Sequence, residues 1–192
     1  MPRTSRLDTP GLLHHVMIRG IERRRIFDDN KDCENFIERL SILLPETKTR
    51  CYAWVFMFNH AHFLFRSGPP GISTLMRRLL TGYAVSYNRR HKRHGQLFQN
   101  RYKSIICQED AYLKELVRYI HLNPLRAELV ADLKALDSYS YCGHSSLMGK
   151  KRYKWQDIKY VLGFYGTKIG EARKNYRAYV EQGIAKGRRP EL

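Results

Sequence analysis

Two histidines one residue apart, His60 and His62, form the first pattern in which side-chain type and spacing suggest chemistry. Aromatic and β-branched residues surround them and indicate a strand, in which side chains two positions apart point to the same face. Two imidazoles on one face are a natural pair of ligands for a divalent metal ion. In a chain with eight histidines the pattern alone is a weak signal, and packing explains it equally well.

Tyr119 and Asn123 form the second pattern, directly before Pro124. On a helix, residues four apart share a face, so a phenol nucleophile and an amide oxygen that suits a hard cation would project together. Taken alone, each residue is better explained structurally, Tyr119 by packing on a sheet and Asn123 by capping a helix end. Pro124 disfavours helical geometry at Asn123 and predicts that the helix ends there.

The chain must position these groups on strands and helices, and its hydrophobic pattern alternates between the two. Strands are predicted over 14–19, 51–58 and 60–65, with a tight turn at 58–59 and a bent strand or strand pair over 97–107. Helices are predicted from caps at 28–30 to Pro45, over 72–87, and from Glu109 to Pro124. Further helices are expected over 155–162 and 169–184. The prediction is an α+β fold, an antiparallel sheet flanked by helices, with a helical C-terminal extension.

Charge points to a polyanionic partner. Lys and Arg number 35 against 18 Asp and Glu, a net charge of +17, and no acid stands between Glu46 and Glu109. Interleaved aromatic residues suit unpaired bases, although a solvated basic face is the plainer alternative. Each candidate is individually an ordinary surface cation, so the prediction concerns the group. The candidate phosphate contacts are Arg77, Arg78, Arg89, Arg90, Lys92 and Arg93, then Arg101 and Lys103, with Arg23, Arg24 and Arg25 as a second basic corner.

Composition excludes several classes of protein. At 192 residues and 43% hydrophobic content the chain can bury a core, so general disorder is excluded. Apolar runs such as 52–58 are far shorter than a membrane span, and no signal peptide is expected at the start. Four scattered cysteines argue against a disulfide scaffold or zinc knuckle. A reducing cytoplasmic location, without a membrane partner, is therefore expected.

The combined patterns resemble the single-tyrosine HUH transposases, and within them the REP-associated tyrosine transposases of the IS200-like transposase family. The segments that carry the resemblance are 15–20, 54–62, 98–103 and 119–124, in family order across roughly residues 10 to 145. The resemblance implies a ferredoxin-like or RRM-like HUH fold. The catalytic domain is assigned to residues 1–140. The change to a loop with Ser, Tyr and Gly after Asp137 predicts a helical extension over 141–192, which ends in a mobile basic tail at 186–190.

The resemblance also implies a mechanism. His60, His62 and Asn123 would hold one Mg²⁺ or Mn²⁺ ion, and Tyr119 would be the nucleophile that forms a 5′-phosphotyrosine. The expected partner is single-stranded, hairpin-forming DNA at the nucleoid, and a homodimer is possible because some relatives dimerise. Phe58 stands where the family usually has proline, and Ala61 where it has a bulkier residue. Metal affinity is where Phe58 would have its effect.

Two other functions stay open at this stage. One is a catalytically silent, domesticated DNA-binding protein of repeat hairpins, which a Tyr119→Phe change would leave unaffected. The other is an RNA-binding module, which competition between matched DNA and RNA hairpins would reveal. A nuclease built on carboxylates is disfavoured because the 62 residues between Glu46 and Glu109 contain no acid.

Overall fold

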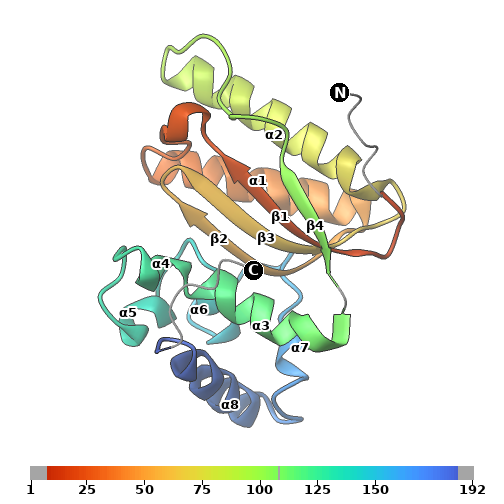
Figure 1. The fold of residues 1–192 in the computed structure, drawn as a ribbon, viewed down its shortest axis with the longest axis vertical. Coiled ribbons are helices and arrows are strands. Elements are labelled where there is room, and N and C mark those ends of the chain that lie inside the picture. Colours follow the sequence, from red (N-terminus) through yellow and green to blue (C-terminus); the bar gives the residue numbers. More distant parts are fainter. Residues whose placement is uncertain (1–7, 108, 186–192) are drawn as a thin grey trace.

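The sheet consists of four strands, and every neighbouring pair is antiparallel (Figure 1). The strands are β1 (Leu13–Arg19), β2 (Arg50–Met57), β3 (His60–Arg66) and β4 (Lys103–Cys107), in the spatial order β2-β3-β1-β4. The computed structural model describes residues 8–107 and 109–185. With one helix between β1 and β2 and another between β3 and β4, this is the ferredoxin-like order. The predicted α+β fold is confirmed.

One face of the sheet is covered by α1 (Asn30–Thr47) and α2 (Gly71–Arg90). Their apolar stripes meet alternate residues of the strands in a core rich in aromatic rings, such as Phe36, Phe56 and Phe63. The Phe36 and Phe63 rings are stacked with centroids 5.9 Å apart. Because this core is closely packed with rings, it supports the sheet on the face opposite the predicted site.

The predicted end of α1 at Pro45 is wrong, because the helix continues to Thr47. Leu43, Leu44 and Thr47 are buried, and this burial offsets the one backbone hydrogen bond that a proline removes. Lys48 follows as the C-cap and adopts a left-handed conformation with φ of 51°.

The other face is covered by the remaining helices (Figure 1). Apolar residues of α7 and α8 share one core cluster with those of α3 and β2. The helical extension is thus present and packed, while a domain boundary at residue 140 stays a prediction. The predicted mobile tail at 186–190 lies outside the described residues. The helices of this face are α3 (Glu109–His121), α4 (Asn123–Arg126), α5 (Leu133–Asp137), α6 (His144–Leu147), α7 (Ile158–Leu162) and α8 (Ile169–Gln182).

The region predicted as a bent strand or strand pair over 97–107 forms one strand, β4, and an isolated bridge between Phe98 and Gly20. Gly20 leads from β1 into a short 3₁₀ turn, η1 (Ile21–Arg23). Among residues 8–107 and 109–185, no helix combines the length and apolar character that crossing a membrane requires.

Candidate active site

The two histidines of the H-x-H pattern lie on the face of β3 that α3 covers. Ala61, Phe63 and Phe65 alternate with them and enter the core under α1 and α2. The ring centroids of His60 and His62 are 5.3 Å apart. The prediction that both imidazoles share one face is therefore confirmed by the strand geometry.

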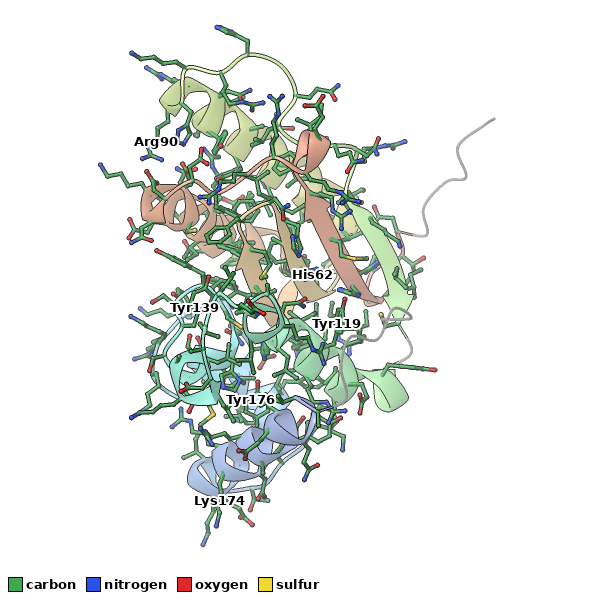
Figure 2. All side chains as sticks on the ribbon, turned by 60° about the vertical axis from the view of Figure 1, so that its left-hand side comes forward. His62, Arg90, Tyr119, Tyr139, Lys174 and Tyr176 are labelled. Atoms are coloured by element: carbon green, nitrogen blue, oxygen red, sulfur yellow. The ribbon has the colours of Figure 1, made fainter. Side chains whose placement is uncertain are left out.

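Tyr119, on α3, lies beside His62 (Figure 2). Its ring centroid lies 6.1 Å from that of His62 and 6.0 Å from that of His15, a β1 residue. Buried residues Val117 and Ile120 fix the helix on the sheet, and Tyr119 itself is half-buried. Two patterns 57 residues apart in the sequence thus meet at one place.

Each histidine of the pair has its Nδ1 atom engaged. His60 Nδ1 lies 2.6 Å from Asn59 Oδ1, and His62 Nδ1 lies 3.0 Å from His15 Nε2. The Asn59 amide nitrogen donates to the Arg23 carbonyl at 3.0 Å, which leaves its oxygen to face His60. Among the described residues no hydrogen bond reaches either Nε2 atom, so both remain for a ligand. Such partners orient the imidazoles of metal sites.

His15 and Asn59 were not among the residues predicted to form the site. Strand alternation puts His15 and Met17 on one face of β1, but only the pairing of Met17 with His62 in the structure brings that face beside the pair. Asn59 belongs to the turn before His60, where only the geometry of the turn shows which way its amide points.

The three imidazoles are uncharged at neutral pH. Burial, together with the charge of Arg19, lowers the pKa of His60 to about 4, and burial with the charge of Lys103 lowers that of His15 to about 4. Burial also lowers the pKa of His62 well below its ordinary value. A neutral imidazole is the form that binds metal, and the two cations give the rim a positive charge suited to phosphate.

Asn123 caps the end of α3, as its structural alternative predicted. Its side-chain nitrogen donates to the carbonyls of Tyr119 at 3.1 Å and Ile120 at 3.3 Å. Pro124 has no N–H to offer the Ile120 carbonyl, so the amide replaces the missing backbone bond. α3 ends at His121, and Asn123 begins α4. In the described chain, no hydrogen bond joins Asn123 to either histidine of the pair, and its Oδ1 atom is the one left for a cation.

Phe58, in the turn before His60, does not disturb the β2–β3 hairpin. Its carbonyl accepts N–H groups of Ile26 and Phe27 at 2.8 and 3.2 Å. Its exposed ring lies under the Arg25 guanidinium, 4.6 Å from centroid to Cζ. These contacts hold the turn that a proline would otherwise stiffen.

A buried polar network anchors the helix that carries Tyr119. The Tyr176 hydroxyl lies 2.7 Å from His121 Nδ1 and 2.9 Å from His144 Nδ1. His144 Nε2 in turn lies 2.8 Å from Asp137, which also accepts a hydrogen bond from Arg177 at 2.9 Å. α3 is thereby tied to α5, α6 and α8, and Tyr176 appears below Tyr119 in Figure 2.

The eleven predicted DNA contacts lie at the surface, where Arg93 is half-buried and the others are exposed. Arg25 lies at the same end of the sheet as His60, because its neighbour Ile26 bonds the Phe58 carbonyl. The Tyr87 hydroxyl is 3.4 Å from the Arg25 carbonyl, which brings the end of α2 to this corner. The basic group at 23–25 therefore lies at the His60 end of the sheet, and the end of α2, which leads into the group at 89–93, contacts it.

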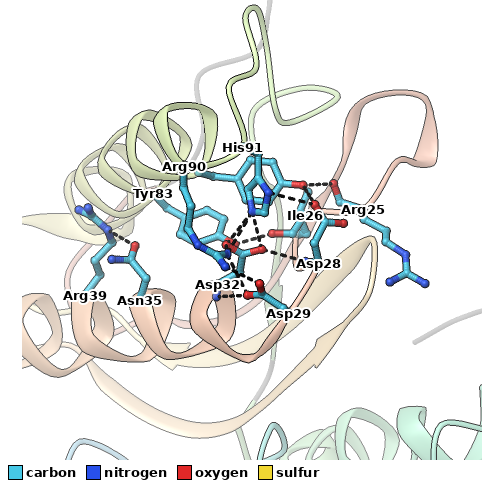
Figure 3. Close-up of polar contacts among 11 residues, drawn as sticks. Arg25, Ile26, Asp28, Asp29, Asp32, Asn35, Arg39, Tyr83, Arg90 and His91 are labelled. Atoms are coloured by element: carbon cyan, nitrogen blue, oxygen red, sulfur yellow. Dashed lines mark hydrogen bonds and ion pairs between the residues drawn. The ribbon is translucent and has the colours of Figure 1, made fainter.

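Arg90 also has a structural role (Figure 3). Its guanidinium bonds Asp29 at 2.8 Å and Asp32 at 2.5 Å, tying α2 to the start of α1. Asp28, Asp32 and His91 have ligand atoms within 4.8 Å of one another. However, Asp32 already bonds Arg90 and His91 and accepts the Asp28 N–H at 2.9 Å, so its carboxylate is engaged at the start of α1, where Asp29 is the N-cap.

Comparison with known proteins gives the class to which this fold and site belong. The family model described as "Transposase IS200 like" matches residues 9–123, a range that includes His60, His62, Tyr119 and Asn123. The chain belongs to the IS200-like transposase family. No curated protein matches it.

Two solved structures are similar. A REP-associated tyrosine transposase bound to a REP hairpin has 15% sequence identity and a TM-score of 0.63, covering 82% of this chain and 93% of that one. At this identity the likeness shows a shared fold. A putative transposase from Deinococcus radiodurans R1 has 14% identity and a TM-score of 0.42, covering 60% of this chain and 93% of that one.

Proposed function

We propose that this transposase cleaves and rejoins single-stranded, hairpin-forming DNA through a 5′-phosphotyrosine on Tyr119. The observation that carries the proposal is the position of the Tyr119 ring, 6.1 Å from that of His62. A nucleophile beside two neutral imidazoles that can bind a cation suits metal-assisted phosphoryl transfer.

The donor set fits one divalent cation. His60 and His62 would offer Nε2 atoms, and Asn123 would offer its amide oxygen. Imidazoles favour Mn²⁺ in affinity, while Mg²⁺ is the ion that prefers oxygen and retains water. When bound, the cation would polarise a non-bridging oxygen of the scissile phosphate and offset the charge that builds up there.

The reaction balances without an external energy source. The Tyr119 oxygen forms a bond to phosphorus as the bond from phosphorus to the 3′ oxygen breaks. The phenol loses its proton, and the departing 3′ oxygen gains one. Because the phosphodiester is replaced by a phosphotyrosine ester, a 3′-OH can reverse the step and join a different strand end.

Charge and fold favour DNA as the substrate. The basic group at 23–25, at the His60 end of the sheet, suits a phosphate backbone, and the similar REP-associated transposase is bound to a REP hairpin. We extend the proposal to a cytoplasmic location at the nucleoid. Whether the protein forms a homodimer is tested separately, by light scattering of the protein alone and with hairpin DNA.

Covalent trapping tests the proposal. Protein, labelled hairpin DNA and Mn²⁺ or Mg²⁺ are mixed, denatured in detergent and examined for a shifted band. The band should require metal and disappear in Tyr119→Phe. Tyr112→Phe is the matched control, because Tyr112 is on the same helix but 50% exposed; it should keep the band.

Other outcomes identify other functions. Tight hairpin binding with no band under either metal would point to a silent DNA-binding protein. Preference for a matched RNA hairpin would point to the RNA-binding alternative.

A further inference from the structure

An open groove lies at the β2 edge of the sheet, where the end of α1 meets the segment before α7. Its volume is about 510 Å³. Four cationic side chains line it, Lys48, Arg50, Lys154 and Lys159, together with the carboxylate of Asp157. None of these cations belongs to the predicted DNA contacts, so this is a second and separate concentration of positive charge.

Most of this charge is available to an external anion. Asp157 Oδ1 accepts the Tyr160 N–H at 3.0 Å to cap α7, and Oδ2 lies 3.9 Å from Arg50. Within the part of the chain that the structure describes, Lys48, Lys154 and Lys159 form no ion pair, and all three are exposed. Three lysines therefore face the solvent beside the groove without a carboxylate partner.

Trp155 lines the same groove and provides it with an aromatic wall. Its ring is half-buried and packs against Trp54, with centroids 5.1 Å apart, and against Tyr153 at 5.6 Å. An aromatic ring that is held in place beside cations is the combination that binds unpaired nucleotides, because bases stack on the ring while phosphates meet the cations.

The groove wall is fixed to the sheet and is thus a preformed surface. The Asp157 N–H donates to the Cys51 carbonyl of β2 at 2.8 Å, and Gln156 pairs with Cys51 in a parallel bridge. The Gln156 side chain accepts the Trp54 indole N–H at 2.9 Å and donates to the Gly143 carbonyl at 3.1 Å. A wall held this way does not have to be ordered when a ligand binds.

The position of the groove separates it from the reacting centre. Arg50 begins β2, whereas Met57 at the other end of the strand pairs with His60. With a rise of about 3.3 Å per residue, the two ends of β2 lie about 20 Å apart. A ligand in the groove is therefore several nucleotides away from the phosphate that would meet Tyr119.

We propose that this groove binds an unpaired stretch of the DNA substrate, with a base against Trp155 and phosphates on Lys48, Lys154 and Lys159. The choice of DNA as the ligand rests on the proposed function, while binding of a single strand in the groove does not depend on cleavage. The sequence carries a matching signal, since residues 150–155 hold four cations and two aromatic rings in six positions.

Tryptophan emission tests the proposal directly, because Trp54 and Trp155 are the chain's two tryptophans and Trp54 is fully buried. The full chain, carrying Tyr119→Phe to prevent cleavage, is titrated with a 12-nucleotide oligo-dT in EDTA. Emission should be quenched on binding. Trp155→Phe, which keeps a ring in the wall, should retain binding and lose the quench.

Charge reversal in the groove supplies the quantitative test. Lys154→Glu with Lys159→Glu should weaken oligo-dT binding at least about 10-fold. The fall of log K with log salt should become shallower, with the magnitude of its slope reduced by about 1.4 or more. Lys168→Glu with Lys174→Glu is the charge-matched control, since both lysines are exposed and neither lines the groove. The control should keep the quench, with a much smaller loss of affinity.

Three results would overturn the inference. They are binding without a change in Trp155 emission, equal loss of affinity in the groove and control variants, and tighter binding of oligo-rU than of oligo-dT. Covalent trapping with the Tyr119 protein separates the two proposals. An adduct without the quench would contradict only the proposal of binding in the groove. The quench without an adduct would contradict only the proposed cleavage mechanism.

Discussion

The two faces of the sheet differ in what they bury. Under α1 and α2, the centre is a set of stacked and tilted rings, with Phe36, Phe56 and Phe63 all at 2% exposure or less. Under α3, the same strands bury imidazoles, with His15 at 1% and His62 at 7%. Each of these imidazoles has a polar partner, so the cost of burying it is offset.

This difference shows how one sheet can be both rigid and reactive. The aromatic face is held mainly by apolar contact, which tolerates no cavity but specifies no chemistry. The histidine face needs particular partners, and these partners determine which nitrogen stays free. Because side chains alternate along a strand, neighbouring residues in β1 or β3 sample opposite faces, and paired substitutions can break each face separately.

The largest effect is expected from His62→Ala on the histidine face. The variant should lose metal-dependent adduct formation, because one proposed metal ligand and the partner of His15 disappear together. Mn²⁺ binding, followed by calorimetry on the DNA-free protein, should fall at least about 10-fold. Unchanged Mn²⁺ affinity would show that the ion binds elsewhere.

Phe63→Ala, the neighbouring residue, tests the opposite face. Removing a fully buried ring should cost about 3–5 kcal/mol in the free energy of unfolding, measured by urea titration. At low temperature, where the variant remains folded, Mn²⁺ affinity should be close to that of the parent. If Phe63→Ala instead abolished metal binding in folded protein, the two faces would not be separable.

Tyr176→Phe tests the polar network under α3. The change removes the hydroxyl shared by His121 and His144, leaving two buried ring nitrogens without that partner, and should cost about 1–3 kcal/mol. Hydrogen exchange should rise in α3 more than in α1.

The matched control is Tyr165→Phe. The Tyr165 hydroxyl is also buried but has no hydrogen-bond partner among the described residues, and its ring lies 5.4 Å from that of Tyr176. Its unfolding free energy should change by no more than about 0.5 kcal/mol. Equal losses in the two variants would mean that the Tyr176 hydrogen bonds contribute nothing to stability.

The comparison also explains how much of the molecule the sequence could predict. Alternation in 60–65 and helical spacing around Tyr119 are local patterns, and both the strand face of His60 and His62 and the helix carrying Tyr119 followed from them. His15 depends on which strands pair, which no local pattern states. The polar partner of His121 comes from residue 176, and contacts over such separations are set by packing.

Proline shows the same limit of local rules. Pro45 was expected to end α1, yet burial of Leu43 and Leu44 carries the helix past it. Pro124 was expected to end α3, and α3 does stop at His121. There the Asn123 amide replaces the bond that proline cannot make. A proline's effect depends on whether the surroundings supply a substitute contact.

The smallest expected effect is on how the free energy of unfolding depends on pH. Substitutions of His15 and of its neighbour Val16 compare this dependence for the two faces of the sheet. The pKa of His15 is about 4 in the folded chain, lowered by burial and by Lys103, against about 6.5 when unfolded. Between these values the unfolded chain binds more protons, so the unfolding free energy decreases as pH falls, by up to about 1.4 kcal/mol per pH unit from this group.

His15→Phe, in EDTA, should therefore give a shallower dependence of unfolding free energy on pH between 7 and 5, with a difference of about 1–2 kcal/mol over the range. Val16→Ala, which removes a fully buried side chain of the other face, should lower stability equally at both pH values. Since the remaining buried histidines also titrate, the slope of His15→Phe should decrease without vanishing. An unchanged slope would mean that His15 takes up a proton as readily in the folded chain as in the unfolded one, and the histidine face would then lack the neutral imidazoles on which its chemistry depends.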